Sequence, residues 1–235
     1  MTGAETLGLR QKLRARQRQL VVNIDFTSPS LVQALARDCA DVIFVDCEQG
    51  DTSIGSIPDL RRAAHVEATP LLVRLPDPGA ASIERYLFRG IDGIVVPRLD
   101  RPAQAEAVIE AVNYSMGARA DTVAIVIQIE SAAAAGAIDA FLSLARIDAF
   151  FVGPVDLSRS MGHGGDISHP EVARQIDRLI RRITSAGRCA GMLCTQGTIA
   201  ANEARGVSFL YLHTMDFLRH GIAPFAAIQT KDQAK

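Results

Sequence analysis

Two carboxylates follow two successive apolar segments in the middle of the chain. The segment TVAIVIQIE ends at Glu130, and the segment IDAFFVGPVD ends at Asp156. We expect both segments to contain buried strands, with the two side chains at the ends of adjacent strands. Carboxylate oxygens suit a hard divalent cation such as Mg2+, which keeps further coordination positions for water or substrate. The sequence therefore predicts a metal centre with Glu130 and Asp156 as its protein ligands.

Apolar runs alternate with helix-forming segments along the whole chain. The predicted strands are 20–24, 41–46, 70–75, 92–97, 122–130, 147–153, 188–193 and 207–213, and the predicted helices are 29–38, 57–67, 79–89, 102–113, 131–143, 170–186, 197–205 and 216–228. Continuously apolar strands are typical of a parallel sheet that is covered on both faces. Eight strand–helix units predict an α/β fold, a (β/α)8 TIM barrel, with residues 1–235 forming one domain that begins with a short helix.

Polar side chains stand where the predicted strands end, which in a barrel of this kind is the active-site face. They are Asn23, Asp25, Asp46, Glu48, Arg74, Pro97, Arg98, Gln128, Glu130, Asp156, Cys194 and His213. A cation would neutralise the carboxylates, and a buried arginine such as Arg74 would hold a substrate carboxylate in a two-pronged contact. Asn23 and Asp25 are interpreted as loop caps and are left out of the candidate site.

Composition narrows the class of protein. The 235 residues carry a formal net charge of -1 and contain no tryptophan, so no nucleic-acid partner is expected. The basic segment from Arg10 to Arg18 is interpreted as a solvated amphipathic helix. No apolar run is long enough to cross a bilayer, and four cysteines without CxxC spacing indicate a reduced, cytoplasmic protein. The apolar C-terminal segment FLRHGIAPFAAI predicts a homo-oligomer.

Five motifs together resemble one enzyme family. They are VDCEQG, VRLPDP, IVVPRL, VIQIES and GPVDLSRSMGHGGDISHPEV, each at the end of a predicted strand. From about Val21 to Phe217, the chain resembles the HpcH/HpaI aldolase and citrate lyase β-subunit family. These proteins are metal-dependent class II pyruvate aldolases built on a (β/α)8 barrel. The resemblance implies a carbon–carbon lyase that acts on a small 2-oxo acid through a pyruvate enolate.

The resemblance also implies roles for single residues. Glu130 and Asp156 correspond to the ligands of Mg2+ or Mn2+. Arg74 corresponds to the arginine that stabilises the carboxylate and enolate oxygen of pyruvate. The remaining correspondences are Gln128 in the same pocket, Gly153 and Pro154 with their backbone against the pyruvate carboxylate, and Asp46 and Glu48 as acids that hold metal-bound water.

The chain departs from the family pattern in its proton-transfer groups. Gln49 stands where the aldolases carry a histidine base, and Phe88 stands where they carry its aspartate partner from a neighbouring subunit. Glutamine cannot accept a proton at neutral pH. A long loop between the fourth helix and the fifth strand is also shortened, which predicts a more open mouth or one completed by a partner.

Three consequences remain open at this stage. Another base acts, the reaction needs no base, as in oxaloacetate decarboxylation, or catalysis is lost and the protein only binds 2-oxo acids. His213 is the candidate replacement base, although a core histidine is the alternative interpretation, and His163 and His169 are weaker candidates. The candidate catalytic residues are therefore Arg74, Glu48 and His213. A CoA-ester lyase of the citryl-CoA or malyl-CoA type is a further alternative, although the chain shows no obvious basic set for CoA phosphates.

Overall fold

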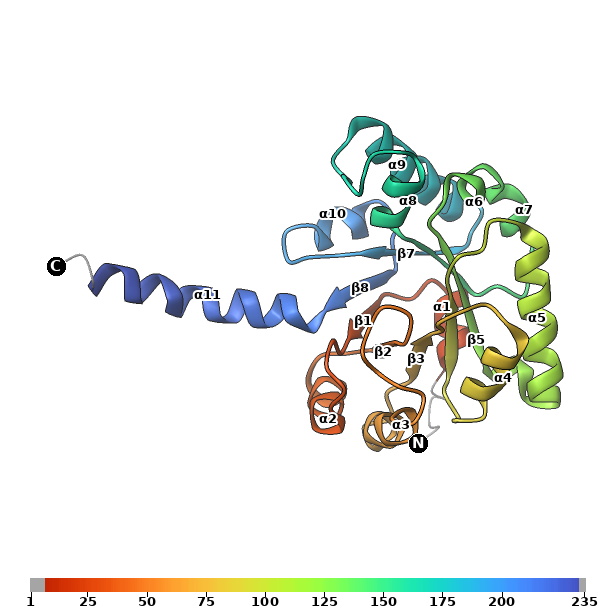
Figure 1. Ribbon diagram of the computed structural model, residues 1–235, viewed down its shortest axis with the longest axis horizontal. Helices are drawn as coiled ribbons and strands as arrows, with labels where there is room; N and C mark the ends of the chain where they lie inside the picture. The colour runs from red at the N-terminus through yellow and green to blue at the C-terminus, as the bar shows by residue number, and fades with distance from the viewer. Residues whose placement is uncertain (1–6, 233–235) are drawn as a thin grey trace, which may run out of the picture.

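Eight parallel strands close into a barrel in their order along the chain, which confirms the predicted (β/α)8 fold (Figure 1). The structure is a computed structural model that describes residues 7–232, with side chains described from 7 to 225. The strands are β1 (Gln19–Asn23), β2 (Val42–Asp46), β3 (Leu71–Arg74), β4 (Gly93–Val96), β5 (Ala124–Ile129), β6 (Ala149–Val152), β7 (Cys189–Leu193) and β8 (Phe209–His213). The barrel closes where β1 pairs with β8, and this pairing places Asn23 opposite His213. The pairing of β2 with β3 places Asp46 opposite Arg74.

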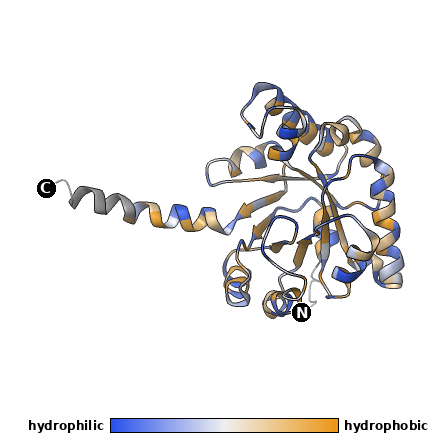
Figure 2. Cartoon of the chain, in the orientation of Figure 1, coloured by the Kyte–Doolittle hydropathy of each residue, from blue (hydrophilic) through white to orange (hydrophobic). Residues whose placement is uncertain are grey.

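Most of the helices cover the outside of this barrel, whereas the first lies at one end of it and the last extends away from it. The helices are α1 (Leu9–Arg14), α2 (Pro29–Asp38), α3 (Ile57–Val66), α4 (Ala80–Leu87), α5 (Pro102–Met116), the 3-10 helix η1 (Gly117–Thr122), α6 (Ala132–Gly136), α7 (Ile138–Leu142), α8 (Pro154–Ser160), α9 (Pro170–Ser185), α10 (Ile199–Ala204) and α11 (Thr214–Asp232). Figure 2 shows that these helices mix hydrophobic and hydrophilic residues, whereas the strands are mainly hydrophobic. Burial on both faces explains why the strands are continuously apolar in the sequence.

Three helical segments differ from the prediction. The predicted helix 131–143 is two short helices that break at Ala137, next to Gly136, a poor helix former. The segment after β6 was predicted to be a loop, but it forms α8, because Pro154 supplies a fixed φ suited to a first helical turn. The helix predicted at 102–113 continues to Met116 before η1, so the shortened loop is helical.

Aromatic rings fill the inside of the barrel below its C-terminal end. Tyr211 meets the edge of Phe44 at a centroid distance of 4.8 Å and that of Phe151 at 5.2 Å. Phe209 packs against Phe151 at 5.8 Å. Edge-to-face pairs at these distances are favourable beyond their buried area. The rings form a packed floor beneath the polar residues at the mouth.

The short helix α1 closes the other end of the barrel. Leu9 and Leu13 are buried in the same cluster as the inward-facing strand residues. Arg10 and Arg14 pair with Asp148, whose side chain is fully buried. The segment is amphipathic as predicted, and Gln11 and residues 14–18 are exposed. It has a further structural role, because its apolar face seals the barrel and two of its arginines pair with a buried carboxylate.

Asp148→Asn is expected to lower the free energy of unfolding by about 3 kcal/mol, because it leaves buried arginines without their counter-charge. Asp148 accepts from Arg14 at 2.7 Å, from Arg146 at 2.9 Å and from the backbone N–H of Ile125 at 2.9 Å. Urea unfolding measures the change. The control Asp38→Asn removes an exposed pair with Arg37 and is expected to cost under about 0.5 kcal/mol. Equal losses in the two variants would contradict this assignment.

Candidate active site

The predicted site residues converge on a cavity of about 150 Å³ at the C-terminal end of the barrel. Its lining includes Asp46, Arg74, Gln128, Gly153, Pro154, Asp156 and His213, all of which the sequence nominated. Glu130 and Glu48 lie directly behind this lining, where Glu130 contacts Gln128 and Glu48 contacts Arg74. The barrel thus assembles the residues from β2, β3, β5, α8 and β8 into one site.

Arg74 is held in place by two carboxylates. Its Nε donates to Asp46 Oδ1 at 2.8 Å, and its Nη2 donates to Asp46 Oδ2. Its Nη1 lies 3.2 Å from Glu48 Oε2. Burial opposes ionisation of Asp46, but the hydrogen bonds and charge of Arg74 outweigh it and hold the pKa of Asp46 below its usual value. Arg74 is thus ion-paired, and it also lines the cavity as a fixed cation.

Glu48 pairs with both Arg74 and a second arginine, Arg98, which was not among the predicted catalytic or binding residues. Arg98 Nε donates to Glu48 Oε1 at 2.7 Å. The Glu48 side chain is only 4% exposed, and its Oε2 has no hydrogen-bond partner among the described residues. This oxygen therefore contacts Arg74 only through the ion pair, which leaves room for an additional donor such as a bound water.

Glu130 is oriented by two donors and by a close backbone approach. Gln128 Nε2 donates to Glu130 Oε2 at 2.8 Å, and the backbone N–H of Arg98 donates to Oε1 at 2.6 Å. Arg98 adopts a left-handed φ of 59°, a strained conformation for a residue with a side chain. A Cβ at Gly153 would lie only 2.9 Å from Glu130 Cβ, so glycine is required there. The backbone around Glu130 is shaped to place this carboxylate.

The electrostatics of Glu130 fit a cation ligand. Burial raises the pKa of Glu130 to about 7, with Glu48 and Asp156 adding to the rise against the opposing Arg98 N–H and Arg74. Asp156 lies in the first turn of α8, is partly exposed, and pairs with Arg159 at 2.9 Å. The buried Gln128 Oε1 has no partner among the described residues. A divalent cation bound to Glu130 and Asp156 would offset the repulsion between these carboxylates and complete its coordination with water and substrate.

Proton competition at Glu130 predicts that metal affinity depends on pH. Because the metal-free carboxylate has a pKa of about 7, protons compete with the cation below that value. We expect Mn2+ to bind about tenfold more weakly at pH 6 than at pH 8. Isothermal titration at both pH values measures this. Equal affinity at the two values would contradict it, since a carboxylate of ordinary pKa is ionised at both.

His213 lies beside Asp25, a residue whose sequence position was interpreted as a loop cap. His213 Nδ1 is 2.6 Å from Asp25 Oδ1, and Asn23 Nδ2 lies 3.3 Å from the same ring nitrogen. Tyr211 meets the ring edge-on at 5.0 Å. Asp25 follows β1 and His213 ends β8, so only closure of the barrel brings them together. The sequence signal that could have found Asp25 was its place among the strand-end residues.

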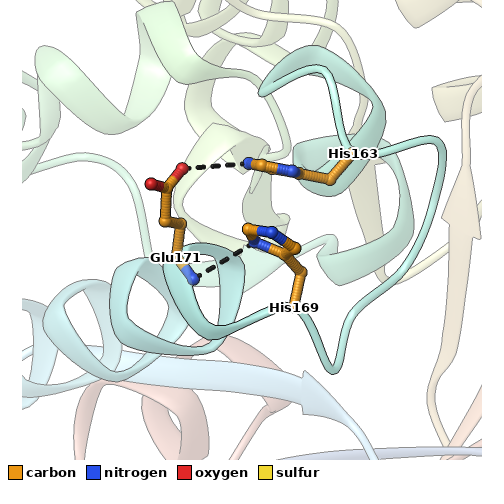
Figure 3. A group of neighbouring side chains, drawn as sticks. All are labelled: His163, His169 and Glu171. Atoms are coloured by element: carbon orange, nitrogen blue, oxygen red, sulfur yellow. Dashed lines mark hydrogen bonds and ion pairs between the residues drawn. The ribbon is translucent and has the colours of Figure 1, made fainter.

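The two weaker histidine candidates lie away from the mouth cavity, in the loop before α9 (Figure 3). His163 Nε2 is 3.1 Å from Glu171 Oε2, and His169 Nδ1 accepts from the Glu171 backbone N–H at 3.3 Å. The two rings stack with centroids 3.7 Å apart. Ligand atoms of His163, His169 and Glu171 lie within 4.8 Å of one another, but His169 caps the start of α9 and His163 pairs with the Glu171 carboxylate.

Comparison with known proteins places the chain in a family. The family model described as HpcH/HpaI aldolase/citrate lyase matches residues 19–211, which span the whole barrel up to β8. The chain belongs to the HpcH/HpaI aldolase/citrate lyase family. The resemblance drawn from the five motifs is thereby confirmed.

Members of the HpcH/HpaI family match in sequence and in fold. A hydroxypyruvate/pyruvate aldolase of Pseudomonas aeruginosa is 29% identical, over 81% of this chain and 80% of its own. A 2-keto-3-deoxy-L-rhamnonate aldolase of Salmonella typhi is 26% identical, over 96% of each chain. An HpcH/HpaI family structure from Burkholderia cenocepacia superposes with a TM-score of 0.86 at 22% identity, covering 95% of this chain and 98% of its own. This last likeness concerns the fold.

The two departures from the HpcH/HpaI pattern lie in different environments. Gln49 lines the mouth cavity together with Asp46, Arg74 and His213. Phe88 is the C-cap of α4, and its ring is 58% exposed. Neither side chain can take up a proton at neutral pH, whereas His213 lines the same cavity as Gln49.

Proposed function

We propose that this protein is a metal-dependent carbon–carbon lyase that forms or consumes the enolate of pyruvate. The observation that carries the proposal is that Asp156 and the ion-paired Arg74 line one cavity, with Glu130 directly behind its lining against Gly153. Relatives named as pyruvate and 2-keto-3-deoxy-L-rhamnonate aldolases support the same reaction class. The substrate is a small 2-oxo acid.

Different residues would bind the metal ion and the substrate. Glu130 and Asp156 would hold Mg2+ or Mn2+, and when bound this ion supplies positive charge for the developing enolate oxygen. Arg74, fixed by Asp46 and Glu48, binds the substrate carboxylate with the N–H groups that remain free of the ion pairs.

The remaining residues at the cavity position the substrate, the metal ligands and the proton-transfer group. The backbone at Gly153 and Pro154 lies against the carboxylate, and Gln128 orients Glu130. Asp46 and Glu48 position Arg74, and they would also accept hydrogen bonds from water at the metal site. His213 exchanges protons with the substrate. The site therefore combines charge stabilisation with a histidine that can exchange protons.

Release of pyruvate tests this function. A 4-hydroxy-2-oxo acid is mixed with the protein and Mg2+ or Mn2+, and lactate dehydrogenase with NADH reports pyruvate. We expect turnover that EDTA abolishes and added metal restores. No pyruvate from 4-hydroxy-2-oxo acids, with CO2 release from oxaloacetate, would replace the aldolase assignment by a decarboxylase. Binding without turnover of either substrate would leave a 2-oxo-acid-binding protein.

A CoA-ester lyase has less support from the site. Arg74 is the single lysine or arginine among the described residues that line the two mouth cavities, and it is engaged by Asp46 and Glu48. The phosphates of CoA need a cationic surface. Binding and cleavage of a CoA ester would overturn this ranking.

The C-terminal helix supports assembly into a homo-oligomer. In Figure 1, α11 extends away from the barrel instead of packing on it. It exposes Phe217, Leu218, Ile222 and Phe225, by 39%, 54%, 65% and 69%. At its root lies an apolar groove of about 340 Å³ that includes Leu20, Val22 and Ile199. A second copy is the partner proposed for both surfaces, because each would otherwise stay exposed to water.

The double variant Ile222→Glu/Phe225→Glu is expected to shift the assembly toward monomer by adding two charges to this face. Light scattering after size-exclusion chromatography measures the mass. Arg219→Gln on the same helix is the control and is expected to keep the wild-type mass. An unchanged mass for the double variant would rule out assembly through α11.

No helix within residues 7–232 is long and apolar enough to cross a membrane. The four cysteines are unpaired, which supports a reducing compartment such as the cytoplasm. Cys39 is exposed, and an exposed thiol is retained most readily where thiols stay reduced.

A further inference from the structure

A second cavity, of about 310 Å³, adjoins the candidate active site at the barrel mouth. The two cavities share Asp46, Gln49 and His213 as lining residues. A molecule in the second cavity would therefore lie next to a 2-oxo acid in the first, with His213 between them. A two-substrate carbon–carbon lyase needs this arrangement.

Asp25 fixes the ring of His213 between these cavities. Asp25 Oδ1 lies 2.6 Å from His213 Nδ1, and Oδ2 accepts from the backbone N–H of Met215 at 2.8 Å. Asn23 Nδ2 donates to Oδ1 at 3.1 Å. Asp25 also adopts a left-handed φ of 50°. Such strain in a non-glycine residue is maintained where surrounding contacts over-determine the conformation, and it concentrates at functional sites.

The hydrogen-bonding pattern leaves one nitrogen of His213 free to act. A carboxylate on Nδ1 keeps the proton on that atom, so Nε2 carries the lone pair. Nε2 has no hydrogen-bond partner among the described residues. An imidazole oriented in this way is suited to general acid–base catalysis.

The second cavity is polar but carries no lysine or arginine among the described residues that line it. Asn23, Gln49 and Thr52 offer neutral hydrogen-bonding groups, while Asp25, Asp46 and Asp51 are carboxylates. Carboxylates next to a bound phosphate or carboxylate would repel it. Hydroxyl and carbonyl groups can bind to the same lining without this cost.

We propose that Asp25 and His213 form the acid–base pair for the second reactant, and that this reactant is an uncharged hydroxylated aldehyde bound in the second cavity. His213 is the catalytic residue, and Asp25 is the positioning residue that orients it. The inference rests on the proposed function and deepens it by placing the proton transfer and the aldehyde.

The step balances as a reversible aldol cleavage. His213 Nε2 accepts the proton of the C4 hydroxyl, the C4–O bond becomes a carbonyl, and the C3–C4 bond breaks. The electron pair of the C3–C4 bond is delocalised over C3 and the C2 carbonyl, which gives the pyruvate enolate and releases the aldehyde. The protonated His213 then returns the proton to C3 of the enolate, giving pyruvate. No oxidant or further reactant is required.

Variants of the pair test the acid–base assignment. We expect His213→Gln to slow metal-dependent deuterium exchange at the pyruvate methyl group by 10²-fold to 10⁴-fold, with Mn2+ affinity unchanged. Asp25→Asn should slow it about tenfold or more, and the double variant should be no slower than His213→Gln alone, because Asp25 acts through His213. Additive losses, or wild-type exchange in His213→Gln, would overturn the pair.

The chain offers a matched control in a second histidine–aspartate pair. His65 Nε2 lies 2.8 Å from Asp92 Oδ2, just before β4 and so at the opposite end of the barrel. His65→Gln should keep the wild-type exchange rate. If the wild-type protein gave no exchange, both the proposed function and the Asp25–His213 assignment would fail. If the wild-type protein gave exchange and His213→Gln exchanged at the same rate, only the Asp25–His213 assignment would fail.

The charge of the aldehyde is tested by a matched pair of acceptors. With pyruvate as donor, we expect kcat/KM for glyceraldehyde to exceed that for glyceraldehyde 3-phosphate by at least about tenfold. The variant Asp51→Arg should narrow this ratio, because it replaces a repelling charge in the lining. A wild-type preference for the phosphorylated aldehyde would overturn the proposed substrate class.

Discussion

Glu130→Gln is expected to abolish Mn2+ binding and to lower pyruvate-forming activity at least about a thousandfold, which corresponds to about 4 kcal/mol of transition-state stabilisation. The amide removes the negative charge that holds the cation but keeps almost the same shape. Its Oε1 can still accept from the Arg98 N–H. Gln128 can turn its unpartnered Oε1 toward the new amide, so the fold should be preserved.

Electron paramagnetic resonance of free Mn2+ measures the binding, and the pyruvate assay measures the activity. Glu106→Gln makes the same chemical change on an exposed position of α5 and is expected to leave both unchanged. Mn2+ binding at wild-type strength by Glu130→Gln would show that this carboxylate is not a ligand.

Arg74→Lys is expected to lower kcat/KM for the 2-oxo acid by about a hundredfold and to reduce the free energy of unfolding by about 2 kcal/mol. Lysine keeps the charge, but it cannot contact both Asp46 oxygens and Glu48 together as the guanidinium does. The two carboxylates lose part of their pairing in a buried site, and the substrate carboxylate loses a fixed planar partner.

Steady-state kinetics and urea unfolding separate the two effects. Arg37→Lys changes an exposed arginine that pairs with Asp38, and it is expected to alter stability by less than about 0.5 kcal/mol. An Arg74→Lys variant with wild-type kcat/KM would remove Arg74 from substrate binding, even if its stability fell.

The barrel and most of its mouth could be predicted because the relevant signals are local. Each strand is a buried apolar run, and the functional residues stand directly after these runs, as with Glu130 after β5 and Arg74 at the end of β3. Barrel geometry then places all such ends at one face. The family motifs added roles that spacing alone does not supply.

The remaining features depend on contacts between distant segments. Asp25 acquires its role only when β8 pairs with β1, which brings it to His213 across 188 residues. Arg98 matters through its backbone N–H and its left-handed φ, and neither is visible in the residue type. Arg10 and Arg14 stabilise the fold because they pair with the buried Asp148, which lies far away in the sequence. Hydrophobic periodicity reports burial but not these pairings.

The most direct test of the account is deuterium exchange at the pyruvate methyl group, followed by NMR in D2O with Mg2+ or Mn2+ and with EDTA as control. The account predicts metal-dependent exchange, since Glu130 and Asp156 would hold the ion, Arg74 the carboxylate, and His213 would move the proton. Absence of exchange at saturating pyruvate and metal would contradict an enolate-forming lyase with a working base.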